Sequence, residues 1–127
     1  MLAGVKVFRP MSEDTPIDLL VLSAVGRVFK CQCKYLYERS GAHCMNLYSV
    51  RKNGPGDKAR KHVYRADEVD FFLGYCVEDD GVYVVPYAET KGRSELLFWI
   101  TRRPQGAHNQ ARAFDCSKWR GAYDLLK

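Results

Sequence analysis

Three polar side chains of different chemistry occur close together in the first third of the chain. Asp18 offers a carboxylate, Gln32 an amide oxygen and Lys34 an ammonium group. A carboxylate and an amide oxygen are ligands that a hard divalent cation such as Mg²⁺ accepts, and a nearby ammonium group can offset negative charge that develops in a reaction. The three residues therefore make a candidate metal site with an adjacent cation, provided that the fold brings them together.

A predicted β-hairpin brings them together. Residues 18–23 and 27–36 are typical of strands and are joined by a short glycine-containing turn. Such a hairpin pairs residues whose numbers sum to about fifty, which places Asp18 opposite Gln32. Because side chains alternate along a strand, Gln32 and Lys34 share one face of the sheet.

Length and composition predict one folded domain. The chain has 127 residues, of which 46% are hydrophobic and 13% aromatic, so we expect a single domain over 1–127 with a real core. The first ten residues lack a sustained apolar segment, and no later run approaches the roughly 18 apolar residues of a membrane span. We therefore expect a soluble cytoplasmic protein without a membrane partner.

The cysteines do not suggest a disulfide framework. They are odd in number, have scattered spacing and have no secretory signal before them, so reduced thiols are expected. Cys31 and Cys33 could be read as half of a zinc site, but no second pair completes four ligands. A simpler interpretation makes both of them small apolar residues on the buried face of a strand. The five cysteines are Cys31, Cys33, Cys44, Cys76 and Cys116.

Positive charge is concentrated in two segments. The net charge is +5, which is compatible with a nucleic-acid partner. The first segment surrounds a Gly-Pro-Gly sequence that excludes regular structure, and it would either contact phosphates or serve as a solvated loop. The second surrounds Pro104 and would either reach a groove or end a strand. The candidate residues are Arg51, Lys52, Lys58, Arg60 and Lys61 in the first segment, and Arg102, Arg103, Asn109 and Gln110 in the second.

The remaining pattern predicts more strand than helix. A short helical turn is expected over 65–70, and the spacing of apolar residues predicts a short helix over 114–126 that packs on the sheet. No internal repeat or linker is present. Strands are expected near 5–8, 18–23, 27–36, 44–51, 71–77, 82–86 and 95–101.

The order and spacing of several short motifs resemble the P-D-(D/E)-x-K endonuclease superfamily. More narrowly, the chain is similar to the branch of cyanobacterial group I intron homing endonucleases in which glutamine replaces the second acidic residue. The resemblance implies that 1–127 is a single nuclease-like domain with an α+β fold, a mixed β-sheet core of the restriction-endonuclease-like type and few helices. The motifs are Gly4-x-x-Val7-x-Arg9-Pro10, Pro16-x-Asp18, Gln32-x-Lys34, Tyr64-x-x-x-x-Val69-Asp70 and Gly81-x-Tyr83-x-x-Pro86.

The resemblance also implies roles for the three polar residues. Asp18 would bind Mg²⁺ or Mn²⁺, Gln32 would be a neutral metal ligand or would orient the attacking water, and Lys34 would polarise that water and offset charge on the phosphate. The expected activity is metal-dependent hydrolysis of double-stranded DNA, which the basic residues of both segments would hold. Enzymes of this kind assemble as homo-oligomers, either dimers or tetramers.

One departure from the family leaves alternatives open. Related enzymes carry a helix before the first strand, with a glutamate that joins the metal site, and that leading helix is apparently absent here. Because Gln32 is neutral, Asp18 alone should hold Mg²⁺ weakly, unless Glu13 or Asp14 substitutes for the glutamate. A non-catalytic DNA-binding or assembly module is therefore a second possibility. RNA processing is a third, in which Tyr35, Tyr37 and Tyr48 near the basic segment would stack on unpaired bases, although such tyrosines more often pack at strand edges.

Overall fold

A computed structural model of the protein describes residues 4–12, 15–39, 42–51, 54–56, 58–99, 113–115 and 117–127. Within these residues the chain is built almost entirely from short strands, and its helical segments are 3₁₀ turns of three or four residues. None of the helices in this described part is long and apolar enough to cross a membrane. The elements are β1 (Lys6–Phe8), β2 (Leu19–Leu22), β3 (Val28–Arg39), β4 (Ala42–Asn46), β5 (Tyr48–Arg51), β6 (Arg60–Val63), β7 (Phe71–Cys76), β8 (Gly81–Pro86), η1 (Tyr87–Thr90), β9 (Glu95–Trp99), β10 (Ala113–Asp115), η2 (Ser117–Trp119) and η3 (Tyr123–Leu126).

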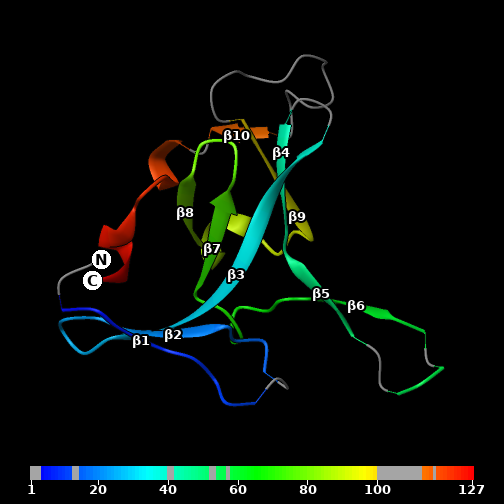
Figure 1. The fold of residues 1–127 in the computed structure, drawn as a ribbon, viewed down its shortest axis with the longest axis horizontal. Coiled ribbons are helices and arrows are strands. Elements are labelled where there is room, and N and C mark those ends of the chain that lie inside the picture. Colours follow the sequence, from blue (N-terminus) through cyan, green and yellow to red (C-terminus); the bar gives the residue numbers. More distant parts are fainter. Residues whose placement is uncertain are drawn as a thin grey trace.

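The main sheet is organised around β3, which runs through the middle of the molecule (Figure 1). Along its length, β3 pairs first with β2, then with β7 and finally with β4. The strand order is β1-β2-β3-β4-β9-β10, with β7 joined to β3 and β8 joined to β7. The β3–β7 and β9–β10 pairs are parallel, whereas the other pairs of this sheet are antiparallel. The expected mixed sheet with few helices is therefore confirmed.

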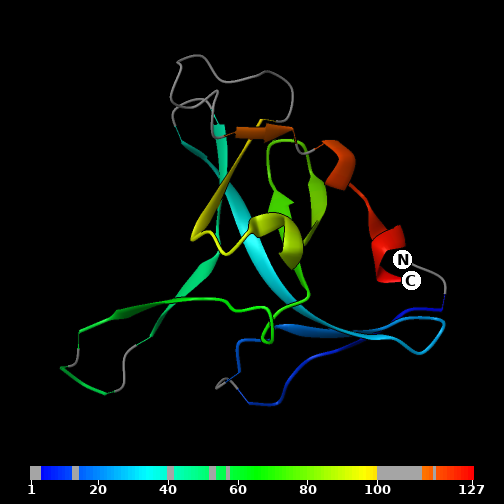
Figure 2. The same ribbon diagram turned by 180° about the vertical axis from the view of Figure 1, so that it is seen from behind.

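Strands β5 and β6 form a separate antiparallel hairpin that projects away from the main sheet, as both views show (Figures 1 and 2). We call residues 48–63 the basic arm. The sequence predicted one strand over 44–51, but the strand is interrupted at Leu47, which is buried in the core. The chain leaves the main sheet at Leu47 and comes back along β6, a strand that the sequence did not predict.

The two faces of β3 meet different surroundings. Leu36 belongs to the larger core cluster, which also contains Phe72 of β7. Cys31 points to the other face and packs in a smaller cluster with Val21 and Val84. Cys33 lies on the same face as Cys31 but is exposed, so the expectation that both cysteines are buried is correct for Cys31 and wrong for Cys33.

The expected helix over 114–126 is wrong. This segment begins in β10 and continues through two separate 3₁₀ helices. Gly121 has a positive φ of 61°, and its N–H donates to the carbonyl oxygen of Val82 at 2.8 Å instead of to a preceding helical turn. Trp119 and Leu126 are both buried, but in different core clusters, so the apolar spacing serves two packing sites rather than one helix face. Residues 65–70 likewise form a turn without a helix.

Candidate active site

The register of the β2–β3 hairpin places Asp18 as the sequence predicts. Leu19 lies opposite Cys31, which agrees with the expected sum of fifty. Asp18 immediately precedes β2, and its N–H donates to the carbonyl oxygen of Cys31 at 3.0 Å. Its carboxylate oxygen Oδ2 accepts a hydrogen bond from the N–H of Cys33 at 2.9 Å. Two backbone contacts on β3 therefore fix an exposed carboxylate beside this strand.

Gln32 provides a buried acceptor at the position of β3 that the β2–β3 register places opposite Asp18. Only 9% of the residue is exposed, and its Oε1 atom is buried without a hydrogen-bond partner among the described residues. Leaving a buried polar atom unpaired costs about 1–3 kcal/mol. A cation held between the Asp18 carboxylate and Gln32 Oε1 would supply the missing partner, so these two residues fit a divalent metal ion of the Mg²⁺ class.

Lys34 is held firmly on the same face of β3. Its Nζ donates to the carbonyl oxygen of Tyr48 at 2.9 Å and lies 3.5 Å from the hydroxyl of Tyr64. The same ammonium group lies 5.0 Å from the centre of the Tyr64 ring. Burial lowers the pKa of Lys34, and attraction to the Asp18 carboxylate opposes this effect. The Lys34 ammonium is therefore partly desolvated and close enough to interact electrostatically with the Asp18 carboxylate.

A second layer of contacts supports Tyr64. The ring of His62 packs edge-on against the Tyr64 ring, with centres 6.0 Å apart. His62 Nε2 lies 2.9 Å and 3.0 Å from the two carboxylate oxygens of Glu68, which also accepts a hydrogen bond from the N–H of Arg65. Partial burial would raise the pKa of Glu68, but the hydrogen bonds from Arg65 and His62 lower it. Glu68 therefore stays ionised and holds the His62 ring against Tyr64.

Arg9 and Tyr64 are two site residues to which the sequence assigned no role. A cleft of about 210 Å³ opens beside Asp18, and exposed Arg9 is among its lining residues together with Pro10 and Ser12. The sequence signal for Arg9 was its place in a motif that precedes Asp18. Nothing in the sequence indicated that Tyr64 contacts Lys34, because the two residues are thirty positions apart.

The predicted DNA-binding residues lie partly on the basic arm. Lys58, Arg60 and Lys61 are exposed, and Lys61 Nζ lies 4.0 Å from the centre of the Tyr48 ring. Arg51 ends β5 and pairs with Arg60 across the hairpin. Since Tyr48 and Tyr64 flank this hairpin and both contact Lys34, the base of the arm is part of the candidate site. Lys52, Arg102, Arg103, Asn109 and Gln110 lie outside the described residues, as do Glu13 and Asp14.

Comparison with known proteins identifies the family of this chain and supports its fold. The family model of the PD-(D/E)XK endonucleases matches residues 1–120. The solved structure of a bacterial homing endonuclease, I-Ssp6803I, is similar with a TM-score of 0.68 and 22% sequence identity, covering 97% of this chain and 79% of that one. At this identity the likeness shows the fold alone, which is the expected restriction-endonuclease-like type with a mostly antiparallel sheet. A search of curated proteins finds no match.

The electrostatic link between Asp18 and Lys34 can be measured directly. We expect the Lys34 ammonium to titrate below the usual pKa of lysine, because burial disfavours its charged form. Asp18→Asn should lower that pKa further, because it removes the attraction that opposes burial while the amide oxygen can still accept from the Cys33 N–H. Side-chain NMR titration of Lys34 tests this. Asp124→Asn, at an exposed position near the C-terminus, is the control. An identical Lys34 titration in Asp18→Asn would show that the two groups do not interact.

Proposed function

Because this chain belongs to the PD-(D/E)XK endonuclease family, we propose that it is a homing-endonuclease-like enzyme that hydrolyses phosphodiester bonds of double-stranded DNA with the help of a divalent metal ion. We propose Asp18, Gln32 and Lys34 as its catalytic residues. The observation that carries the proposal is the buried Oε1 of Gln32, which has no hydrogen-bond partner among the described residues and lies on the face of β3 that also bears Lys34. Continuing the β2–β3 register by one residue places Asp18 opposite Gln32.

Asp18 and Gln32 would hold Mg²⁺ or Mn²⁺. When bound, such an ion supplies Lewis-acid polarisation of the phosphate and lowers the pKa of a coordinated water. The Asp18 carboxylate gives the charge that attracts the ion, and its bond to the Cys33 N–H keeps it in one orientation. Gln32 contributes an oxygen without a second negative charge.

Lys34 would offset the negative charge that builds on the phosphate during cleavage. Its ammonium group is already oriented by the Tyr48 carbonyl and by Tyr64, so little reorganisation is needed when charge develops. Partial burial strengthens its electrostatic effect, because fewer water molecules screen it. Arg9, beside the cleft next to Asp18, would hold a neighbouring phosphate of the DNA backbone.

The basic arm would bind the DNA backbone next to the site. Lys58, Arg60 and Lys61 are exposed on a hairpin that extends away from the main sheet (Figure 1). Each cation that contacts a phosphate releases condensed counterions, which favours binding at low salt. One copy of the site faces one DNA strand, so we propose that cutting of both strands needs a homo-oligomer, either a dimer or a tetramer.

A non-catalytic DNA-binding or assembly module is the second candidate function. The neutral charge of Gln32 favours this candidate. Among the described residues, Asp18 is then the carboxylate that is fixed beside this part of β3. Hard cations depend on carboxylate charge to compensate for their lost water, so a single carboxylate favours weak metal binding. This candidate keeps the DNA contacts and omits the cleavage.

Removing the Lys34 ammonium separates the two functions. We expect wild type to cut plasmid and genomic DNA into discrete fragments with Mg²⁺ or Mn²⁺ and to lose this activity in EDTA. Lys34→Ala should reduce the cleavage rate by about 100-fold or more while largely keeping DNA affinity, because it removes charge stabilisation that is greatest in the transition state. Lys6→Ala, at an exposed position on β1, is the control. DNA that is bound by wild type but never cut with either metal would support the non-catalytic module.

A charge change at Gln32 tests the metal site without DNA. Gln32→Glu should tighten Mg²⁺ binding by about tenfold, because it adds a second carboxylate ligand. The similarly sized Gln32→Met should weaken binding, because it removes the oxygen. Calorimetric titration of the purified protein with Mg²⁺ measures both effects. The same affinity in all three proteins would place Gln32 away from the ion.

Salt dependence tests the role of the basic arm. Arg60→Ala and Lys61→Ala should each weaken DNA binding for all sequences alike, and each should reduce the slope of log affinity against log salt by about 0.9 for every phosphate that is no longer neutralised. Fluorescence anisotropy with labelled duplex DNA at several salt concentrations measures the slope. Lys127→Ala removes a cation from the C-terminal end and should leave the slope unchanged. A wild-type affinity that does not change with salt would exclude phosphate binding by this arm.

A further inference from the structure

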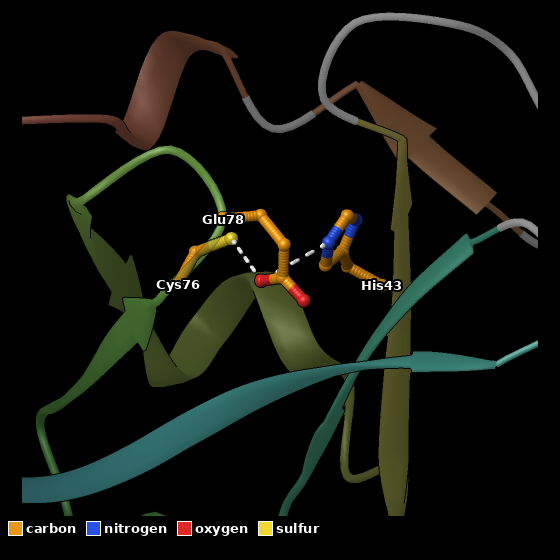
Figure 3. Close-up of side chains that lie close together, drawn as sticks. All are labelled: His43, Cys76 and Glu78. Atoms are coloured by element: carbon orange, nitrogen blue, oxygen red, sulfur yellow. Dashed lines mark hydrogen bonds and ion pairs between the residues drawn. The ribbon is translucent and has the colours of Figure 1, made fainter.

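A second group of metal-ligating side chains lies at the other end of β7 (Figure 3). His43 comes from β4, Cys76 is the last residue of β7, and Glu78 lies in the turn between β7 and β8. One ligand atom from each of the three residues lies within 4.8 Å of the other two. Figure 3 shows the three side chains pointing toward one another from these separate elements.

We propose that His43, Cys76 and Glu78 bind a divalent transition-metal ion of the Zn²⁺ class, in a site distinct from the proposed active site. The distances suit this ion. Cys76 Sγ lies 3.3 Å from Glu78 Oε2, and His43 Nε2 lies 3.6 Å from the same oxygen. Ligands at the usual zinc distances form the corners of a tetrahedron whose edges are about 3.3–3.8 Å. Both distances to Glu78 Oε2 therefore match the edges of such a tetrahedron, and the remaining pair of ligand atoms lies within 4.8 Å.

One ring nitrogen of His43 has no hydrogen-bond partner among the described residues. His43 Nε2 is buried and makes no hydrogen bond with any described residue, because 3.6 Å to Glu78 is too long for one. A buried ring nitrogen without a partner is costly, and metal coordination would satisfy it. The other two acidic residues of this turn have partners elsewhere. Asp79 accepts hydrogen bonds from Gly81 N–H and from Arg120 Nε, and Asp80 accepts one from the Tyr75 hydroxyl.

The burial of the ligands suits an open three-ligand site. Cys76 is fully buried, whereas 53% of the Glu78 side chain is exposed. Glu78 therefore borders solvent, and an ion held by the three residues would have its fourth position available to water.

The donor atoms distinguish this site from the one at Asp18 and Gln32. Sulfur and imidazole nitrogen favour zinc and similar transition metals, whereas oxygen ligands favour Mg²⁺.

The two sites are also separated in space. Gln32 pairs with Phe72, and Leu36 pairs with Cys76, so the two sites are four residues apart along paired strands. This corresponds to about 13 Å, which is too far for one ion to serve both sites.

Bound metal would cross-link two branches of the sheet. β4 leads from β3 to β9 and β10, and β7 leads from β3 to β8. An ion between His43 and the end of β7 would join these branches close to where both leave β3. Binding of the ion would therefore stabilise the fold, and this effect does not depend on the proposed nuclease activity.

Zinc titration of the full chain tests the proposal. Protein that has been stripped with a chelator should bind about one equivalent of Zn²⁺, and its melting temperature should rise as the ion is added. His43→Gln and Glu78→Ala should each weaken Zn²⁺ binding at least about tenfold and reduce the rise in melting temperature. Both variants leave the buried Cys76 in place. With Co²⁺ as the probe, the wild type should show a thiolate-to-metal charge-transfer band, which reports the Cys76 ligand.

Matched controls locate the ion. Glu89→Ala and Cys33→Ser change an exposed glutamate and an exposed cysteine, and both variants should bind Zn²⁺ as wild type does. Asp18→Asn should also leave Zn²⁺ binding unchanged, even if it weakens Mg²⁺ binding. The proposal is overturned if wild type binds no Zn²⁺, if His43→Gln and Glu78→Ala keep the wild-type affinity, or if Asp18→Asn is the variant that loses it.

Discussion

The parallel pairing of β3 with β7 is the constraint on which the rest of the structure depends. It is fixed at its start by Asp70, whose carboxylate accepts from the Lys30 N–H at 2.7 Å and whose own N–H donates to the Lys30 carbonyl oxygen at 2.8 Å. Because side chains alternate along a strand, a slip of one residue would exchange the two faces of β3. Gln32 and Lys34 would then leave the side of the larger core cluster. Asp70 therefore secures the orientation of the candidate site without belonging to it.

Direct contacts of Lys34 connect the candidate site to the basic arm. Lys34 Nζ donates to the carbonyl oxygen of Tyr48 at the start of β5 and lies near the hydroxyl of Tyr64 just after β6. The ammonium group therefore contacts the chain where it enters the arm and where it leaves the arm. His62 on β6 is in turn held by Glu68. If the arm binds DNA as proposed, a force on the arm would reach Lys34 through these contacts. The proposed DNA-binding segment would then also position the ammonium group that is proposed to stabilise the reacting phosphate.

The local parts of this fold were predictable from the sequence, and the parts set by distant contacts were not. The β2–β3 register followed from a short hairpin whose turn left few alternatives. The break at Leu47 was not predictable, because no glycine or proline marks it in 44–51 and Leu47 is buried in a core formed by distant residues. The helix expected over 114–126 failed for a similar reason, since Gly121 bonds to Val82 and the apolar residues divide between two clusters. Cys33 was misassigned because alternation predicts a face but not whether anything covers that face.

The neutral charge of Gln32 becomes understandable when the site is considered without a metal ion. Its side chain is almost completely buried, and a carboxylate there would lose most of its hydration. Such a group would either take up a proton or destabilise the fold whenever the ion was absent. An amide avoids this cost, because leaving one oxygen unpaired is cheaper than burying an uncompensated charge. The exposed Asp18 keeps its charge in contact with solvent and also attracts the desolvated Lys34. This division of charge lets the protein fold with one anion and one cation near each other, and in the proposed metal site it would weaken the binding of Mg²⁺.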